Sequence, residues 1–266
     1  MNLGLGGARA VVTGGSKGMG RAVCERLAAE GTAVAVLARG QAALDDTVES
    51  LRRGGSDASF ALSVDFTDRS AVDEAFAEIG RRWSSLNVLV NTLGPGAGRF
   101  EQLDDRDWEA TFSIGLMAAV RAVRGALPLL RAAEWARIVN FSAHSTHRQS
   151  PLLVAYTASK SALTSFSKNL SKSLAAEGIL VNVVSPGSIV TASFSEGLRG
   201  AFEAEGLDPT DPHDVMDWID RHFHQPADLG RAGLPEEVAS LVAYLASRTN
   251  GYVTGADVNV DGGSDF

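Results

Sequence analysis

The sequence predicts a single α/β domain, residues 1–266, built on a doubly wound, seven-stranded parallel sheet with helices on both faces. Short, almost continuous apolar runs alternate with longer segments of helical periodicity, which is typical of strands buried on both faces and of their crossover helices. A chain of 266 residues suits one such domain with a substantial core. Neither a linker nor an internal repeat divides the chain.

The strands are predicted from runs rich in β-branched residues, beginning with ARAVVT. They lie at 8–13, 33–38, 59–64, 86–91, 136–141, 179–184 and 256–260. The predicted helices lie at 18–30, 41–53, 68–83, 105–133, 152–177 and 235–247. Right-handed crossovers would join consecutive parallel strands. Residues 192–230 are too long for an ordinary loop and rich in aromatics, so we expect a substrate lid there.

Composition excludes several classes of function. A net charge of −8, with no cluster of Lys and Arg, argues against a nucleic-acid surface. The only cysteine, Cys24, excludes an internal disulfide and a Cys-rich metal site. The N-terminus lacks the basic and apolar regions of a signal peptide, and no apolar run approaches the roughly 18 residues of a membrane span. We therefore expect a cytoplasmic protein with no nucleic-acid, membrane or metal partner.

The segment TGGSKGMG, residues 13–20, joins the first predicted strand to the first helix. Glycines at 14, 18 and 20 allow a tight turn and the close approach of a pyrophosphate, which the amides at the helix N-terminus can bind. Ser16, Lys17 and Met19 complete the turn. The spacing G-x-x-x-G-x-G differs from the usual G-x-G-x-x-G, and the G-K-[ST] of a phosphate loop is absent. The turn predicts a dinucleotide site.

The end of the second strand indicates which dinucleotide binds. A carboxylate there would bind the 2′-hydroxyl of NAD(H), whereas an arginine accommodates the 2′-phosphate of NADP(H). Here the strand ends at Arg39, and Lys17 is available from the glycine turn, so we predict NADP(H). Asp65, which follows the third strand, has two open roles: it caps the next helix or hydrogen-bonds the adenine.

Tyr156 and Lys160 stand four residues apart in the fifth predicted helix and therefore share a face. The unperturbed pKa of a tyrosine is about 10, too high for a base at neutral pH. An ammonium at about 4 Å supplies roughly the 4 kcal/mol needed to lower it to about 7. The pair follows the fifth strand, at the sheet edge where α/β proteins bind ligands. It is therefore a candidate acid/base pair.

Together these motifs resemble the short-chain dehydrogenase/reductase family over essentially the whole chain. The matching motifs are T-G-x-x-x-G-x-G at 13–20, Asp65, N-T-L-G at 91–94, Y-x-x-x-K at 156–160, P-G-x-x-x-T at 186–191 and V-D-G-G at 260–263. The resemblance implies a Rossmann-type fold, hydride transfer with a nicotinamide cofactor, and a homotetramer or homodimer built partly on helices 105–133 and 152–177.

By the same resemblance, Tyr156 is the catalytic acid/base, and Lys160 lowers its pKa while holding the nicotinamide ribose. Asn91 and Gly94 would stabilise the strand edge under the cofactor. The segment from Pro186 and Gly187 would lead to Ile189 and Thr191, which would contact the carboxamide end.

Two positions depart from the family pattern. Ala143 stands where the family usually has its catalytic serine, thirteen residues before the tyrosine, and Gly115 stands where it usually has an asparagine. A donor to a developing oxyanion is typically worth 10²–10³ in rate, so losing it would leave a slow enzyme. Ser145 is our preferred substitute, because it can return to the side that Ala143 faces. Ser142, which an extended strand would point to the opposite face, and His144 are further candidates.

The function expected from the sequence is hydride transfer between NADP(H) and a bulky, apolar ketone or secondary alcohol. The substrate class follows from the aromatic residues of the lid, which would either cover the nicotinamide or only pack as helices. A 3-oxoacyl-thioester (acyl carrier) reductase is the alternative within the enzyme class. A weakly active or inactive NADP(H)-binding scaffold or sensor is the alternative outside it, because of Ala143 and Gly115.

Overall fold

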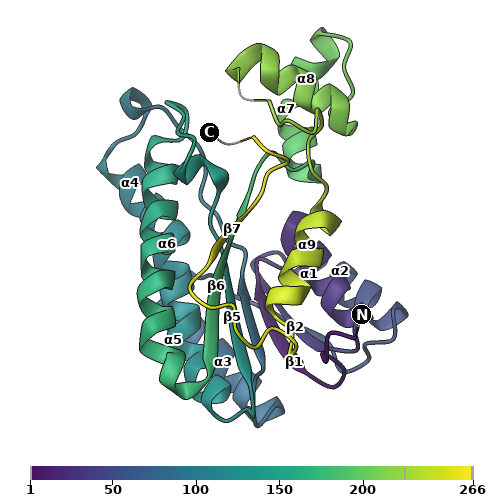
Figure 1. The fold of residues 1–266 in the computed structure, drawn as a ribbon, viewed down its shortest axis with the longest axis vertical. Coiled ribbons are helices and arrows are strands. Elements are labelled where there is room, and N and C mark those ends of the chain that lie inside the picture. The colour runs from purple at the N-terminus through teal and green to yellow at the C-terminus, as the bar shows by residue number, and fades with distance from the viewer. Residues whose placement is uncertain (1, 225, 265–266) are drawn as a thin grey trace.

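The computed structural model describes residues 2–224 and 226–264 of the chain. Its centre is a seven-stranded sheet in the order β3-β2-β1-β4-β5-β6-β7, and every neighbouring pair is parallel (Figure 1). The strands are β1 (Arg9–Thr13), β2 (Ala33–Ala38), β3 (Phe60–Ser63), β4 (Val88–Asn91), β5 (Ala136–Phe141), β6 (Ile179–Pro186) and β7 (Asp257–Val260). The predicted single α/β domain with a seven-stranded parallel sheet is confirmed.

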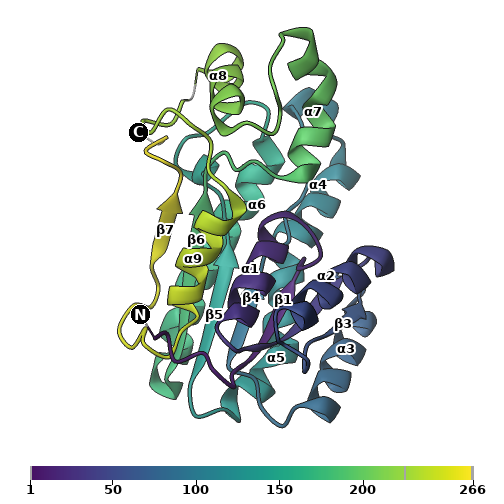
Figure 2. The ribbon, with the colours of Figure 1, turned by 90° about the vertical axis from the view of Figure 1, so that its right-hand side faces the viewer.

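Helices cover both faces of the sheet (Figures 1 and 2). One face carries α1 (Gly18–Ala29), α2 (Gln41–Arg53) and α9 (Pro235–Leu245), and the other carries α3 (Arg69–Arg82), α5 (Ala118–Arg131) and α6 (Val154–Leu174). Side chains alternate between these layers along each strand. In β1, Val12 belongs to the core under α1 and Val11 to the core under α3 and α5.

The helix predicted at 105–133 is interrupted. It consists of α4 (Asp105–Phe112), a π-helical turn (Ser113–Met117) and α5. Together, Asp105–Arg131 are long and apolar enough to cross a membrane. However, α5 buries Ala122 and Ala126 in the core, and Arg121 donates a hydrogen bond to the carbonyl of Phe66. This is the packing of a core helix.

The segment 192–230 folds into two helices, α7 (Ala192–Ala204) and α8 (Pro212–Phe223), beyond the carboxyl ends of the strands (Figure 2). They form a small core of their own. Phe202 is fully buried and stacks on Trp218, with ring centroids 4.9 Å apart. The largest aromatic side chains of the expected lid therefore pack against one another.

Candidate active site

A groove of about 950 Å³ lies at the carboxyl edge of the sheet, where the chain order reverses between β1 and β4. This switch point is where open α/β sheets bind nucleotides. The groove is lined by the glycine turn, by the ends of β2 and β3, and by Leu93, Gly94 and Pro95 after β4. The structure thus brings the predicted cofactor residues of three separate loops to one surface.

The glycine turn leaves no room for larger residues. Gly14 has a φ of +72°, and a Cβ there would lie 2.7 Å from Thr92 Oγ1. A Cβ on Gly20 would lie 2.3 Å from the carbonyl oxygen of Gly14. Lys17, the N-cap of α1, makes no side-chain hydrogen bond to the first amides of that helix. These amides and the close backbone suit a phosphate group.

The two predicted cations, Lys17 and Arg39, both line this groove. Asp65 lines it too, and its carboxylate accepts hydrogen bonds from the backbone N–H and the hydroxyl of Thr67. These bonds lower the pKa of Asp65. The cap of α3 is Asp68, which accepts from Ser70 and Ala71, so the suggestion that Asp65 caps this helix is wrong. Asp65 instead orders the loop that borders the groove.

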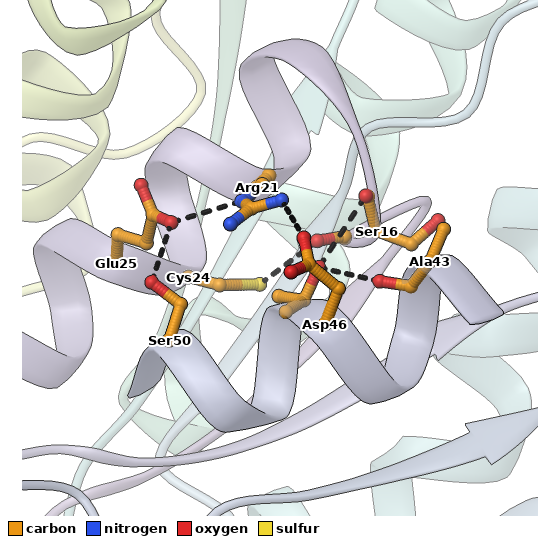
Figure 3. A network of polar contacts seen from close by, with 9 residues as sticks. Ser16, Arg21, Cys24, Glu25, Ala43, Asp46 and Ser50 are labelled. Carbon is orange, nitrogen blue, oxygen red and sulfur yellow. Dashed lines mark hydrogen bonds and ion pairs between the residues drawn. The ribbon is translucent and has the colours of Figure 1, made fainter. Parts of the chain in front are cut away.

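A polar network holds α2 against the glycine turn (Figure 3). Arg21 on α1 forms ion pairs with Glu25 and with Asp46 on α2. Thr47 donates to the carbonyl oxygens of Ser16, at 3.3 Å, and Ala43, at 2.8 Å. The network therefore fixes the start of α2, next to Arg39, relative to the phosphate-binding turn.

Tyr156 and Lys160 both lie on α6, as predicted. The Lys160 side chain is 2% exposed, and its Nζ donates to the carbonyl oxygens of Phe141, at 2.6 Å, and Leu93, at 3.0 Å. Its Nζ is 6.0 Å from the centroid of the Tyr156 ring. A Cβ on Gly94 would approach both side chains, at 3.7 Å from Lys160 Nζ and 4.0 Å from Tyr156 Cε2. The glycine therefore leaves the space beside the pair open.

Burial shifts both pKa values of this pair. Desolvation raises the pKa of Tyr156 to about 12 and lowers the pKa of Lys160 to about 7. This differs from the expectation that the ammonium brings the tyrosine near 7. The physical reason is that desolvation dominates both shifts, and that Lys160 Nζ, 6.0 Å from the centroid of the Tyr156 ring, does not attract a phenolate strongly enough to offset burial. In this structure Tyr156 is a neutral phenol at neutral pH.

The other predicted site residues lie around this pair. Asn91 accepts from Thr13 Oγ1 at 3.2 Å and donates to Asn140 Oδ1 at 2.8 Å, and so joins β4 to both neighbouring strands. Thr191 caps α7 by accepting from the N–H of Phe194, and its Cγ2 would lie 3.4 Å from a Cβ on Gly18. The segment after β6 therefore meets the glycine turn.

The segment that follows β6 is held at both of its ends. Pro186 ends β6, and a Cβ on Gly187 would lie 2.7 Å from the Cα of Asp261. Ile189 pairs with Gly233 in an isolated parallel bridge.

The candidate hydroxyls near Ala143 differ in how they are engaged. Ser142 donates to the carbonyl of Lys160, at 3.3 Å, and accepts from Thr164, at 2.8 Å. Ser145 is 2% exposed and accepts from Thr157 Oγ1 at 3.1 Å. Ser145 is thus an acceptor in this bond, whereas the proton of Ser142 points to a backbone carbonyl. His144 Nδ1 lies 3.2 Å from the carbonyl oxygen of Pro186.

Gly115 lies inside the π-helical turn, against α6. A Cβ at this position would lie only 2.2 Å from Ser159 Oγ, which donates to the carbonyl of Tyr156. Ser159 therefore occupies space that an asparagine side chain would need. Sequence reasoning missed Ser159 because its only signal is its place directly before Lys160.

Arg148, in the loop before α6, was also missed. Its guanidinium donates to the backbone carbonyls of His224 and Ser264. Backbone acceptors carry no signal in a sequence, so nothing in the pattern pointed to this residue.

Comparison with known proteins agrees with this geometry. The family model described as short chain dehydrogenase matches residues 8–199. An uncharacterized oxidoreductase of Bacillus subtilis is 31% identical over 95% of this chain and 94% of its own length. A putative ketoacyl reductase of the monensin polyketide synthase from Streptomyces virginiae is 34% identical over 96% of this chain and 95% of its own.

Among solved structures, L-sorbose reductase from Gluconobacter frateurii, complexed with NADPH and L-sorbose, matches with a TM-score of 0.92. It is 28% identical, over 99% of this chain and 98% of that one. The actinorhodin polyketide ketoreductase with NADPH matches with a TM-score of 0.86 and 29% identity, over 97% of both chains. With the matching family model and the 31%-identical relative, these findings establish that the chain belongs to the short-chain dehydrogenase family of oxidoreductases.

Proposed function

We propose that this protein is an NADP(H)-dependent carbonyl reductase, or alcohol dehydrogenase, in which Tyr156 moves the proton. The observation that carries the proposal is the pair of partly buried Tyr156 and buried Lys160 beside Gly94, a residue that lines the same groove as Lys17 and Arg39. NADP(H), when bound, supplies or accepts the hydride. The amides at the start of α1 would hold its pyrophosphate, and Lys17 and Arg39 its 2′-phosphate.

Tyr156 is suited to donate a proton in the direction of reduction. A phenol whose pKa is raised to about 12 is fully protonated at neutral pH, which is the form that can protonate a carbonyl oxygen. In its protonated form Lys160 keeps a donor for the nicotinamide ribose, because two of the three N–H groups of the ammonium are directed to the carbonyls of Phe141 and Leu93. Oxidation of an alcohol would require Tyr156 to lose its proton first.

A hydroxyl that orients the substrate carbonyl is still needed, because Ala143 has none. We assign it to Ser145, whose oxygen accepts from Thr157 and whose own proton can serve as a donor. Ser142 is the second candidate. It would first have to release its hydrogen bond to the carbonyl of Lys160.

For the substrate we propose a bulky, apolar ketone or the corresponding secondary alcohol. Fewer aromatic side chains are available to contact such a substrate than the sequence suggested, because Phe202 and Trp218 are buried in the core between α7 and α8. Phe194 and Leu198, both only partly buried, remain as apolar side chains of α7 for contact with a substrate. The L-sorbose bound in the similar reductase structure makes a polyol the main competing class.

Reduction of a 3-oxoacyl thioester is a second candidate function. A 3-oxoacyl-[acyl-carrier-protein] reductase of Aquifex aeolicus is 28% identical over 99% of both chains. A carrier-bound substrate needs an open approach to Tyr156 for its long arm. Activity on short acyl thioesters would favour this function over the reduction of free ketones.

A protein that binds NADP(H) with weak or no turnover is the third candidate. Ala143 and the filled space at Gly115 favour it, whereas the intact Tyr156 and Lys160 favour an enzyme. NADPH oxidation would be measured against hydrophobic ketones, polyol-type ketoses, quinones and acyl thioesters. We expect turnover with an apolar ketone. If NADPH binds tightly and no compound of the panel is reduced, the protein is a cofactor-binding scaffold and not the reductase we propose.

A further inference from the structure

Three segments that are distant in sequence meet beyond the carboxyl edge of β5 and β6. The first is the loop from Ser142 to Leu153, which joins β5 to α6 and carries Ser145. The second is the end of α8 together with the return segment 226–230, and the third is the turn after β7, residues 261–264. Their contacts decide how α7 and α8 sit over the site.

The second and third segments are already in contact. Leu229 donates its N–H to the carbonyl of Gly262 at 3.0 Å. A Cβ on Gly263 would lie 3.0 Å from Cβ of Asp228. The turn after β7 also reaches the cofactor side, because a Cβ on Gly187 would lie 3.2 Å from Ser264 Oγ.

Arg148 joins the first segment to the other two. Its Nη2 donates to the carbonyl of His224 at 3.0 Å, and its Nη1 donates to the carbonyl of Ser264. His224 is the C-cap of α8 and has a φ of 51°, in the left-handed region. A guanidinium is favoured at such a helix end, because the carbonyls there carry partial negative charge.

Arginine is suited to this place by geometry. Its planar fork can donate to two acceptors at once, whereas a lysine ammonium is a point charge on a flexible stem. Charge-assisted hydrogen bonds of this kind are also stronger than neutral ones. One side chain can therefore hold two separate backbone segments relative to the loop that leads into Tyr156.

We propose that Arg148 is a positioning residue that fastens α7 and α8 over the substrate side of the site. It does so through the two carbonyls, and it takes no part in proton or hydride transfer. The inference rests on the proposed function only in assuming that the substrate enters beneath α7 and α8. Loss of Arg148 should free the end of α8 and weaken substrate binding, while the groove between the glycine turn and the ends of β2 and β3, which Arg148 does not line, is unchanged.

The first test needs no turnover. Arg148→Ala, Arg148→Lys and the unmodified protein are digested with thermolysin, with and without NADPH, and the cut sites are identified by mass spectrometry. We expect cleavage within 205–230 to be faster by about tenfold in Arg148→Ala, and by less in Arg148→Lys. Arg53→Ala, which removes an exposed arginine at the end of α2, is the matched control and should digest like the unmodified protein.

The second test uses the best ketone from the substrate panel. We expect Arg148→Ala to raise KM by about tenfold with a smaller change in kcat, and to leave the Kd for NADPH within about twofold. Unchanged digestion, or a loss of kcat at constant KM, would overturn the proposal. If Arg148→Ala does not fold, Arg148→Lys decides by the same two measurements. If the protein reduces nothing, the digestion experiment still supports or overturns the role of Arg148.

Discussion

Ser159 on α6 fills the space beside Gly115 in the π-helical turn, so that a Cβ at position 115 would lie 2.2 Å from Ser159 Oγ and 2.8 Å from Ser159 Cβ. This contact links the turn directly to the helix that carries Tyr156 and Lys160. It gives a physical reason for glycine where the family usually has an asparagine.

Restoring the family residue should therefore harm this protein. We expect Gly115→Asn to lower kcat/KM by about tenfold or more, because α6 must move to admit the side chain. The double variant Gly115→Asn with Ser159→Gly removes the clash and should recover part of the loss. Steady-state kinetics of the two variants test this, with Ser159→Gly alone as the control. A Gly115→Asn variant that is more active than the unmodified protein would contradict the packing argument.

The cofactor preference should depend on Arg39. With Lys17 it should make the protein bind NADPH at least about tenfold more tightly than NADH, a difference of about 1.4 kcal/mol. Arg39→Asp should reverse the order, because a carboxylate repels the 2′-phosphate and accepts from a 2′-hydroxyl. Fluorescence titrations of the unmodified protein and of Arg39→Asp, each with NADPH and with NADH, give the four dissociation constants. Tighter binding of NADH to the unmodified protein would rule out the assignment.

Lys160 should make the stability of the cofactor-free protein depend on pH. Its pKa is about 7 in the folded protein and about 10.4 in an unfolded chain, so between these values the unfolded chain binds more protons. The contribution of Lys160 to the free energy of unfolding should therefore rise between pH 7 and pH 9. Urea unfolding of the unmodified protein and of Lys160→Met, at both pH values, gives this contribution as a difference. If the free energy of unfolding of the unmodified protein, relative to that of Lys160→Met, falls between pH 7 and pH 9, the buried lysine is protonated and the prediction is wrong.

Ser145 should replace the missing serine. If it orients the carbonyl, Ser145→Ala should lower kcat/KM by about 10²-fold or more, the effect of a lost oxyanion donor. Ala143→Ser should then raise the activity of that variant, and should add less to the unmodified protein. Steady-state kinetics of Ser145→Ala, Ala143→Ser and the double variant test whether Ser145 has this role. If Ser145→Ala leaves kcat/KM unchanged and Ala143→Ser alone raises it sharply, no residue had replaced the missing serine in orienting the carbonyl.

Most of the fold could be predicted because its signals are local. All seven strands were predicted to within a few residues, since most are short apolar runs buried on both faces; the edge strands β3 and β7 are less buried. The π-helical turn at Ser113–Met117 could not be predicted, because a single wide turn hardly changes helical periodicity over the segment 105–131. The length and aromatic content of residues 192–230 identified them as a separate segment. The sequence did not reveal that Phe202 and Trp218 are buried against each other.

The candidate site was predictable where side chains carry the chemistry, as for Tyr156, Lys160 and the glycine turn. It was not predictable where the partner is backbone. The carbonyls of Phe141 and Leu93 hold Lys160, and those of His224 and Ser264 hold Arg148. The pKa of Tyr156 depends on burial in the folded protein, which a spacing of four residues cannot reveal.

The central claim, that Tyr156 transfers the proton in an NADP(H)-dependent reduction, is tested most directly by Tyr156→Phe. The measurement is NADPH oxidation with the best ketone of the panel, together with the Kd for NADPH from a fluorescence titration. We expect turnover to fall by about 10²–10⁴-fold, the usual contribution of a general acid, while NADPH still binds within about twofold of the unmodified protein. Undiminished turnover in Tyr156→Phe would contradict the account.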